Sequence, residues 1–234
     1  MTRFLPALLV VAALVAAGPA AQAQAKWVAG QHYSVLPQAQ RTQVPAGKVE
    51  VMEVFSYGCP ACNFFQPTLK KLKASLPPNA QMVYLPASWN KAEAWPMFQR
   101  AYLTAQSLGV AEKSHDAMYE AIWTTGELGV TDLKTGRLRT KLPTIEDAAR
   151  FYQRTAGVNA AEFVAASKSF GIDLKARQAD SQIIAMQVTG TPTLLVNGKY
   201  RVNNELRMTP EQIIELVRFL VAKESTAAVP AKKT

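Results

Sequence analysis

The two cysteines of the chain, Cys59 and Cys62, are separated only by Pro60 and Ala61. At the start of a helix, residues with this spacing are close enough for their sulfur atoms to form a disulfide without distorting the helix. The pair can therefore alternate between a dithiol and a disulfide. A cysteine at a helix N-terminus also has a lowered pKa, because unpaired backbone N–H groups and the helix dipole stabilise its thiolate. The spacing indicates a redox-active pair.

Two simpler explanations of the pair compete with a redox role. A structural zinc ion needs four ligands, and only His32 and His115 could complete such a site, at positions without the usual ligand spacing. We therefore expect no metal and no cofactor. A permanent structural disulfide between residues so close in sequence would add little stability, because it removes little entropy from the unfolded chain. A redox role is favoured over both explanations.

Hydrophobic periodicity predicts the elements around the cysteines. Residues 49–55 (VEVMEVF) predict a strand that leads into the pair, and residues 63–76 predict the helix that follows. Asn197-Gly198 is a strong signal for a tight hairpin turn. Further strands are predicted at 33–36, 81–86, 193–196 and 199–202, and a closing helix at 210–222.

The middle of the chain has helical periodicity instead. Helices are predicted at 94–108, 115–123, 144–155 and 159–171. Thr144 and Asn159 each precede an acidic residue by three positions, which is the pattern of a helix N-cap. These caps favour separate short helices over one long helix.

The first residues have the layout of a secretory signal peptide. Arg3 precedes an apolar stretch over residues 4–17, and small residues follow. Because this stretch is too short to span a membrane comfortably, we expect cleavage at the end of residues 1–25, after Ala23 or Ala25. The mature protein is then exported to an oxidising compartment, where a disulfide can persist.

Composition is that of an ordinary globular protein, with 49% hydrophobic and 18% charged residues. The formal net charge of +9 is spread along the chain. Basic residues do not cluster with interleaved aromatic residues, so the sequence does not predict a nucleic-acid groove.

Three segments of the sequence together resemble one protein family. They are FSYGCPAC around the cysteines, VTGTPTLLVNGKY with Thr191-Pro192, and EFVAASKSFGIDLKARQADSQIIAMQV at the end of the helical block. With these segments the chain is similar to the DsbA family of exported thiol:disulfide oxidoreductases, in the thioredoxin superfamily. The resemblance extends from about Tyr33 to Val221.

The resemblance implies an α/β architecture, a thioredoxin fold with an inserted helical domain. Residues 26–88 and 189–222 would form the discontinuous thioredoxin-like domain, and residues 89–188 the helical insertion. Residues 1–25 would be the signal peptide, and residues 223–234 a flexible tail.

The resemblance also implies a role for each residue of the site. Cys59 would be the exposed thiol that exchanges with substrate, and Cys62 the resolving thiol inside the fold. Glu53 matches the buried acid that can accept the proton of the inner cysteine. The alternative for Glu53 is a glutamate at a strand edge in solvent.

Pro192 occupies the cis-proline position of the family. A cis bond there would place Thr191 beside the cysteines and leave backbone groups free to pair with substrate; the alternative is a trans proline that opens an edge strand. Pro60 suits the first turn of a helix, whereas Ala61 replaces the histidine of the best-known members. The lysine that many members place near the buried acid is also missing. Both departures concern the strength of oxidation, not the chemistry itself.

The implied function is that of a periplasmic thiol:disulfide interchange protein. It would donate the Cys59–Cys62 disulfide to unfolded or newly translocated cysteine-containing proteins through a mixed disulfide, and a DsbB-type membrane protein would reoxidise it. We expect a monomer without a nucleic-acid partner. Two alternatives stay open: an exported reductase or isomerase with the same cysteines, and a thioredoxin-like chaperone without redox turnover. The chaperone would bind through aromatic side chains: Phe55, Tyr57, Phe64, Phe65, Trp89 and Trp95.

Overall fold

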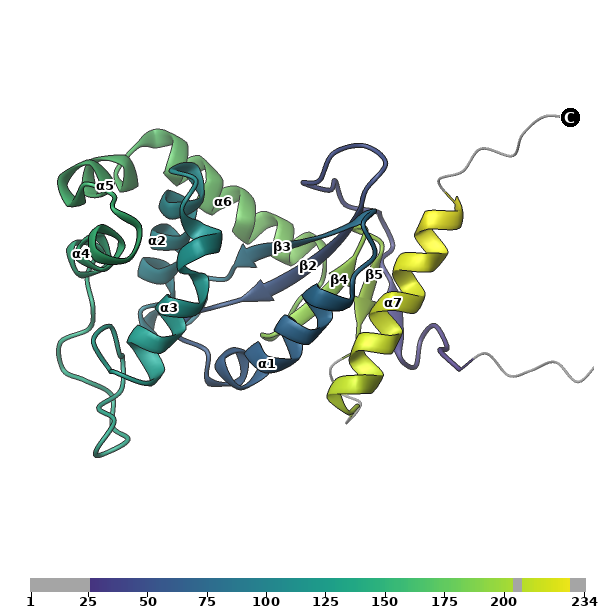
Figure 1. Ribbon diagram of the computed structural model, residues 1–234, viewed down its shortest axis with the longest axis horizontal. Coiled ribbons are helices and arrows are strands. Elements are labelled where there is room, and N and C mark those ends of the chain that lie inside the picture. Colours follow the sequence, from purple (N-terminus) through teal and green to yellow (C-terminus); the bar gives the residue numbers. More distant parts are fainter. Residues whose placement is uncertain (1–25, 204–207, 228–234) are drawn as a thin grey trace, which may run out of the picture.

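The structure is a computed structural model that describes residues 26–203 and 208–227. The predicted signal peptide, residues 1–25, and residues 228–234 of the predicted tail lie outside the described residues. A mixed sheet of five strands carries helices on both faces (Figure 1). In chain order the elements are β1 (Tyr33–Val35), β2 (Val49–Phe55), α1 (Pro60–Ser75), β3 (Ala80–Pro86), the short 3₁₀ helix η1 (Lys91–Glu93), α2 (Trp95–Ser107), α3 (Ala111–Trp123), α4 (Ile145–Ala156), α5 (Ala160–Ser167), α6 (Phe170–Ala185), β4 (Thr193–Val196), β5 (Tyr200–Val202) and α7 (Pro210–Ala227).

Strand β2 lies inside the sheet and leads directly to the cysteines. The strand order is β1-β5-β4-β2-β3, with β2 parallel to β3 and antiparallel to β4. All seven residues of β2 are buried, as expected for a strand that helices cover on both faces. A catalytic segment that follows this strand is therefore anchored in the most protected part of the sheet.

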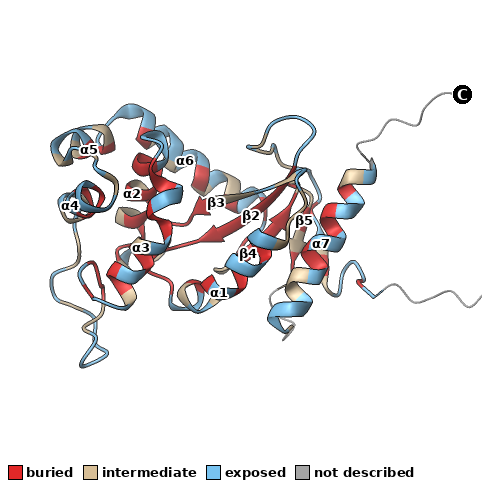
Figure 2. Cartoon of the chain, viewed as in Figure 1, coloured by how far each residue is buried: buried red, intermediate tan, exposed pale blue. Residues whose placement is uncertain are grey.

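The core has two parts, one on each face of the sheet. Val51 of β2 belongs to the part formed with Leu72 of α1 and Leu220 of α7. The next residue, Met52, points to the opposite face and belongs to the part that includes Phe98 of α2. Figure 2 shows the buried residues concentrated in the sheet and on the helix surfaces that face it. Helices α2 to α6 all lie between β3 and β4 in the chain, which confirms the predicted helical insertion.

One predicted helix, residues 159–171, is wrong, because the structure has two helices there. Asn159 caps α5 as predicted, and its side chain accepts a hydrogen bond from the backbone N–H of Glu162 at 3.1 Å. A second cap follows at Ser169, whose hydroxyl accepts a hydrogen bond from the N–H of Ile172 at 3.4 Å. This cap starts α6, which continues to Ala185. Only three residues of α6 are buried, Ile172, Ala179 and Ile183. The helical periodicity of this segment is therefore weak, and its length was missed.

The hairpin turn between β4 and β5 is confirmed. Asn197 and Gly198 have φ angles of 53° and 61°, the pair of positive values that a two-residue type I′ turn requires. Glycine is needed at the second position for a further reason: a Cβ atom on Gly198 would lie 2.2 Å from the carbonyl oxygen of Gln40.

The last helix extends past its predicted end at Ala222. Residues 223–227, where we expected a flexible tail, are helical. The physical reason is Glu224, which is buried with 5% of its surface exposed. Its carboxylate accepts hydrogen bonds from three side chains of the β4–β5 hairpin: Asn197, Lys199 and Tyr200. A charged residue of the predicted tail therefore holds the end of α7 against the sheet.

Candidate active site

The two cysteines lie where β2 ends and α1 begins. Cys59 is the N-cap residue of α1, with extended backbone angles, and Pro60 occupies the first helical position, where a backbone N–H has no partner to lose. The N–H of Cys59 donates to the carbonyl of Ser56 at 3.1 Å, which closes the turn after the strand. The predicted placement of Cys59 at a helix N-terminus is confirmed.

Both cysteines are free thiols in the structure, and both are buried. Cys62 has 0% of its surface exposed and Cys59 has 5%. We expected Cys59 to be exposed, so the structure corrects this detail: Cys59 is merely the more accessible of the two. Its burial follows from a contact across the fold, because its thiol donates to the backbone carbonyl of Thr191 at a distance of 3.5 Å.

The two thiols have opposite shifts in pKa. The hydrogen bond with the Cys62 side chain lowers the pKa of Cys59 from 9.0 to about 6, although burial alone would raise it, and the backbone N–H groups of Ala61 and Cys62 lower it further. One of these groups is the N–H of Cys62, which donates to the sulfur of Cys59 at 3.4 Å. Burial is the largest cause that raises the pKa of Cys62, and the hydrogen bond with the Cys59 side chain raises it further. Near neutral pH the reduced protein therefore has Cys59 as a thiolate and Cys62 as a protonated thiol.

This difference predicts selective alkylation. Iodoacetamide should modify Cys59 with a rate that follows its thiolate fraction and has a midpoint near pH 6. Cys62 should stay unmodified throughout, because it is fully buried and its pKa is raised. Peptide mapping by mass spectrometry measures both rates, and the unfolded protein in denaturant provides the control in which the two thiols react alike. A midpoint near the ordinary value of 9.0 for Cys59 would contradict the assignment.

Glu53 lies in β2 behind the thiols, with 0% of its surface exposed. This burial excludes the alternative of a strand-edge glutamate in solvent. Neither of its carboxylate oxygens has a hydrogen-bond partner among the described residues. Burial, and secondarily the charge of Cys59, raise the pKa of Glu53 well above 4.5. A carboxyl group in this state keeps its proton to a higher pH than an ordinary glutamate and can exchange it with an adjacent group.

The structure brings the predicted Thr191-Pro192 segment to the thiols. The peptide bond between these two residues is cis, which agrees with the family position that we assigned to Pro192. The contact between Cys59 and the carbonyl of Thr191 joins residues 132 positions apart in the chain. Ala61, by contrast, is exposed on the first turn of α1, where a longer side chain would meet solvent.

A groove of about 280 Å³ begins at the Thr191-Pro192 segment. Its other lining residues are mainly apolar and come from α1, from β4, from the end of β5 and from α7 with the segment before it: Phe65, Leu194, Val202, Asn203, Met208 and Ile213. An extended peptide could therefore lie in the groove while one of its sulfur atoms reaches Cys59.

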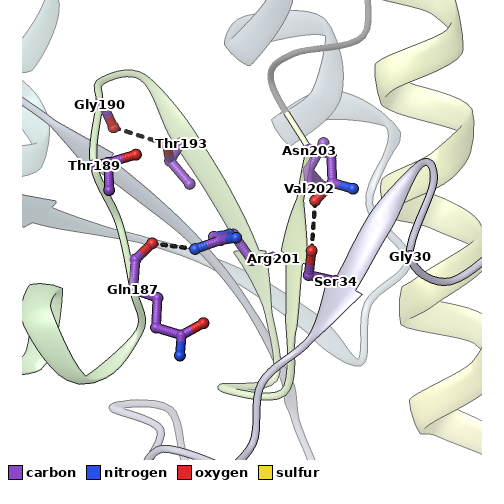
Figure 3. Close-up of a pocket in the computed structure, with 9 residues that line it drawn as sticks. All are labelled: Gly30, Ser34, Gln187, Thr189, Gly190, Thr193, Arg201, Val202 and Asn203. Atoms are coloured by element: carbon purple, nitrogen blue, oxygen red, sulfur yellow. Dashed lines mark hydrogen bonds between the residues drawn. The ribbon is translucent and has the colours of Figure 1, made fainter.

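A second hollow, of about 300 Å³, lies between the segment before β4 and the strands β1 and β5 (Figure 3). Its hydrogen bonds join Arg201 to the carbonyl of Gln187, Thr193 to the carbonyl of Gly190 at 2.8 Å, and Ser34 to Asn203 at 2.7 Å. Neither cysteine lines this hollow. The bond made by Arg201 holds the segment that leads to Thr191 against β5, so this region supports the site from behind.

His115 was missed as part of the site. We considered it only as a zinc ligand, and no group of residues in the described part of the chain could hold a metal ion. Instead, His115 is buried against Tyr57, with its Nδ1 atom 3.0 Å from the tyrosine hydroxyl. Burial lowers the pKa of His115 to about 4, so the ring is neutral. Trp123 also holds this turn, because its indole N–H donates to the carbonyl of Tyr57 at 2.9 Å. The sequence signal that could have pointed to this contact is Tyr57, because it belongs to the FSYGCPAC segment around the cysteines.

Comparison with known proteins decides the family. The thiol:disulfide interchange protein DsbA of Pseudomonas aeruginosa is 36% identical over 224 residues, which cover 96% of this chain and 97% of that protein. The chain belongs to the DsbA family. The DsbA of Pseudomonas syringae pv. tomato is likewise 36% identical over 228 residues and covers 96% of this chain and 99% of its own. A family pattern described as a DSBA-like thioredoxin domain matches residues 137–212 of this DsbA homologue.

Solved structures confirm the thioredoxin fold with its helical insertion. The crystal structure of P. aeruginosa DsbA superposes with a TM-score of 0.71 at 35% identity, over 86% of this chain and 96% of that chain. The oxidoreductase DsbA from Xylella fastidiosa gives a TM-score of 0.72 at 32% identity, over 85% and 98% of the two chains. The DsbA homologue described here is therefore a thiol:disulfide oxidoreductase.

Proposed function

We propose that the Cys59–Cys62 disulfide of this protein is donated to unfolded, newly exported proteins that contain pairs of cysteines. A substrate thiolate attacks the sulfur of Cys59, the bond between the two cysteines breaks, and Cys62 leaves as a thiolate. Protonated Glu53 gives its proton to this thiolate. A second substrate thiolate then attacks the substrate sulfur of the mixed disulfide and releases Cys59 as a thiolate. The substrate loses two electrons, and the cysteine pair gains them.

The observation that carries this proposal is the lowered pKa of Cys59. A stabilised thiolate is a good leaving group, so the mixed disulfide resolves towards the oxidised substrate. The same thiolate stabilises the dithiol form of the protein, which makes its disulfide a stronger oxidant. A high pKa for Cys59 would instead favour a stable disulfide and a reductase.

The direction of electron flow can be tested by comparing the stability of the two redox forms. The pKa of Cys59 is lower in the folded dithiol form than in the unfolded chain, so its thiolate stabilises that form above pH 6. This contribution is lost as the pH falls through about 6 and reaches its full value near pH 9, the ordinary pKa. It corresponds to about 1 kcal/mol at pH 7 and about 4 kcal/mol at pH 9.

Denaturant melts of the oxidised and reduced protein between pH 5 and pH 9 measure this difference. We expect the reduced form to be the more stable one at pH 7, with a gap that widens towards pH 9. The disulfide form has no free thiol to titrate and serves as the internal control. If the oxidised form were more stable at every pH, the protein would be an exported reductase and not a disulfide donor.

The groove at Thr191 and Pro192 is the proposed site for the substrate chain. Its lining is mainly apolar, which suits unfolded segments of many sequences. The lining residues carry no charge that would repel a charged segment. The chaperone alternative loses support, because three of its six aromatic residues, Phe55, Tyr57 and Trp95, are buried in the core. The exposed side chain of Phe64, on the first turns of α1, is instead available to the same substrates as the thiols.

The proposed location is the periplasm, reached through cleavage of the predicted signal peptide. No helix in the described part of the chain has the length and apolar character that a membrane span requires. We further propose that the protein acts as a monomer and that a membrane protein of the DsbB type reoxidises the cysteine pair.

A further inference from the structure

A projecting hairpin between α3 and α4 has no part in the thiol chemistry. It consists of residues 131–141 (TDLKTGRLRTK), which we call the basic hairpin, and it contains four basic residues and one acidic residue. Figure 1 shows the connection between α3 and α4 extending away from the helices at the lower left of the molecule. A charged element in this position is available to a large partner.

The single acidic residue of the basic hairpin is engaged within its own turn. The carboxylate of Asp132 accepts hydrogen bonds from the backbone N–H groups of Lys134, at 3.0 Å, and Thr135, at 2.8 Å. These bonds lower the pKa of Asp132, with the Thr135 N–H as the largest cause. The backbone N–H of Asp132 also donates to the carbonyl of Arg137 at 2.8 Å, so the two arms are joined. The tip is an ordered turn whose acid faces inward to the backbone.

The basic side chains of the hairpin are not used in ion pairs. They are Lys134, Arg137, Arg139 and Lys141, and none of them forms a salt bridge with a carboxylate of the described residues. The lysines of the active-site helix differ in this respect, because Lys70 pairs with Asp116 and Lys71 with Glu211. Cationic charge at the hairpin is therefore available to an external anion.

Two leucines lie among these cations. Leu133 has 49% of its surface exposed and Leu138 has 53%. Leucines exposed to this extent beside lysine and arginine make a surface that is both apolar and cationic. That combination favours the boundary of an anionic bilayer, where cations meet lipid phosphates and apolar side chains enter the outer acyl region.

We propose that the basic hairpin binds the surface of an anionic lipid bilayer, with Lys134 and Arg137 at the lipid phosphates and Leu133 and Leu138 below them. An acidic protein is the less favoured occupant for reasons of size. A specific protein interface involves about 20–30 residues on each partner, whereas the basic hairpin consists of residues 131–141 only. Reversible binding to a bilayer needs only a few cations with an apolar anchor.

Binding at this hairpin would also orient the thiols. Helix α3 ends at Trp123, shortly before the hairpin, and the indole of Trp123 is hydrogen-bonded to Tyr57 in the turn that precedes Cys59. The helix that precedes the hairpin is thus attached to the active-site turn. Docking would hold the thiols near the bilayer, where a membrane reoxidase works. This consequence rests on the proposed function, whereas the lipid binding itself does not.

Vesicle sedimentation tests the proposal with the exported, purified protein. The vesicles consist of phosphatidylcholine alone or with about one third phosphatidylglycerol, at low and at physiological salt. We expect binding to the anionic vesicles only. The double substitution Lys134→Glu/Arg137→Glu should weaken it at least about tenfold, and Leu133→Ser/Leu138→Ser should weaken it several-fold. The matched control Lys70→Glu/Lys71→Glu changes the net charge equally at another place and should retain the binding.

Any other result in the vesicle experiment overturns the proposal. Equal losses in the hairpin and control variants would show attraction by net charge alone. Binding of a polyglutamate peptide without binding of anionic vesicles would assign the hairpin to an acidic protein. Alkylation of Cys59 and oxidation of a soluble reduced peptide are measured in the hairpin variants, and both should stay at the wild-type level. A failure of peptide oxidation in the wild type would contradict the proposed function without affecting the vesicle result.

Discussion

Replacing Cys59 by serine should abolish disulfide donation to a reduced peptide. The remaining thiol, Cys62, cannot substitute for it, because it is fully buried and its pKa is raised. At neutral pH almost none of it is thiolate, so even exchange with a small disulfide should be at least about a hundredfold slower than in the wild type. Single-turnover oxidation of a peptide with two cysteines measures the first effect, and release of a chromophoric thiol from an aromatic disulfide measures the second.

The complementary substitution, Cys62→Ser, should behave in the opposite way. Cys59 stays reactive and attacks the disulfide between a peptide with a single cysteine and a small aromatic thiol, which leaves. The peptide carries no second thiol, and the variant lacks the internal thiol that would release the peptide. The one-to-one mixed disulfide should therefore accumulate and persist, as seen by non-reducing electrophoresis and mass spectrometry. If the Cys59→Ser variant formed the adduct and the Cys62→Ser variant did not, the roles of the two cysteines would be reversed.

Local sequence signals were enough to predict the elements that carry the site. The strand before the cysteines, the turn at Asn197-Gly198 and the helix caps at Thr144 and Asn159 each depend on a few neighbouring residues, and the structure confirms all of them. The spacing of the two cysteines was by itself enough to predict a redox-active pair. These features share a physical basis, because each is stabilised by contacts within one or two turns of the chain.

The remaining features depend on contacts between distant segments, which periodicity cannot reveal. The burial of Cys59 results from Thr191, 132 positions away, and the hydrogen bond between Tyr57 and His115 joins residues 58 positions apart. Glu224 is fixed by a hairpin 24 to 27 residues before it. In each case the fold brings a polar residue to a partner that its sequence neighbours do not reveal.

The second large effect on the rate of disulfide donation is expected from a substitution of Glu53. If its proton neutralises the departing thiolate of Cys62, Glu53→Gln should slow disulfide donation by about a hundredfold, the usual contribution of a positioned acid or base. The matched control is Glu50→Gln, a buried glutamate of the same strand whose carboxylate is occupied by the backbone N–H of Gln43. Single-turnover rates between pH 5 and pH 9 compare the two variants. Equal rates for Glu53→Gln and the wild type at every pH would remove Glu53 from the mechanism.

The same substitution should change stability in a way that depends on pH. The pKa of Glu53 is raised in the folded protein, so below its ordinary value of 4.5 the carboxyl group is protonated in both states and carries no ionisation penalty. As the pH rises above 4.5, the unfolded chain loses this proton and the folded chain retains it, which costs stability at about 1.4 kcal/mol per pH unit. Glu53→Gln removes this penalty, so the variant should become progressively more stable than the wild type as the pH rises. Denaturant melts of the oxidised forms measure the difference without interference from the Cys59 thiolate, and a difference that did not vary with pH would contradict the assignment of a raised pKa.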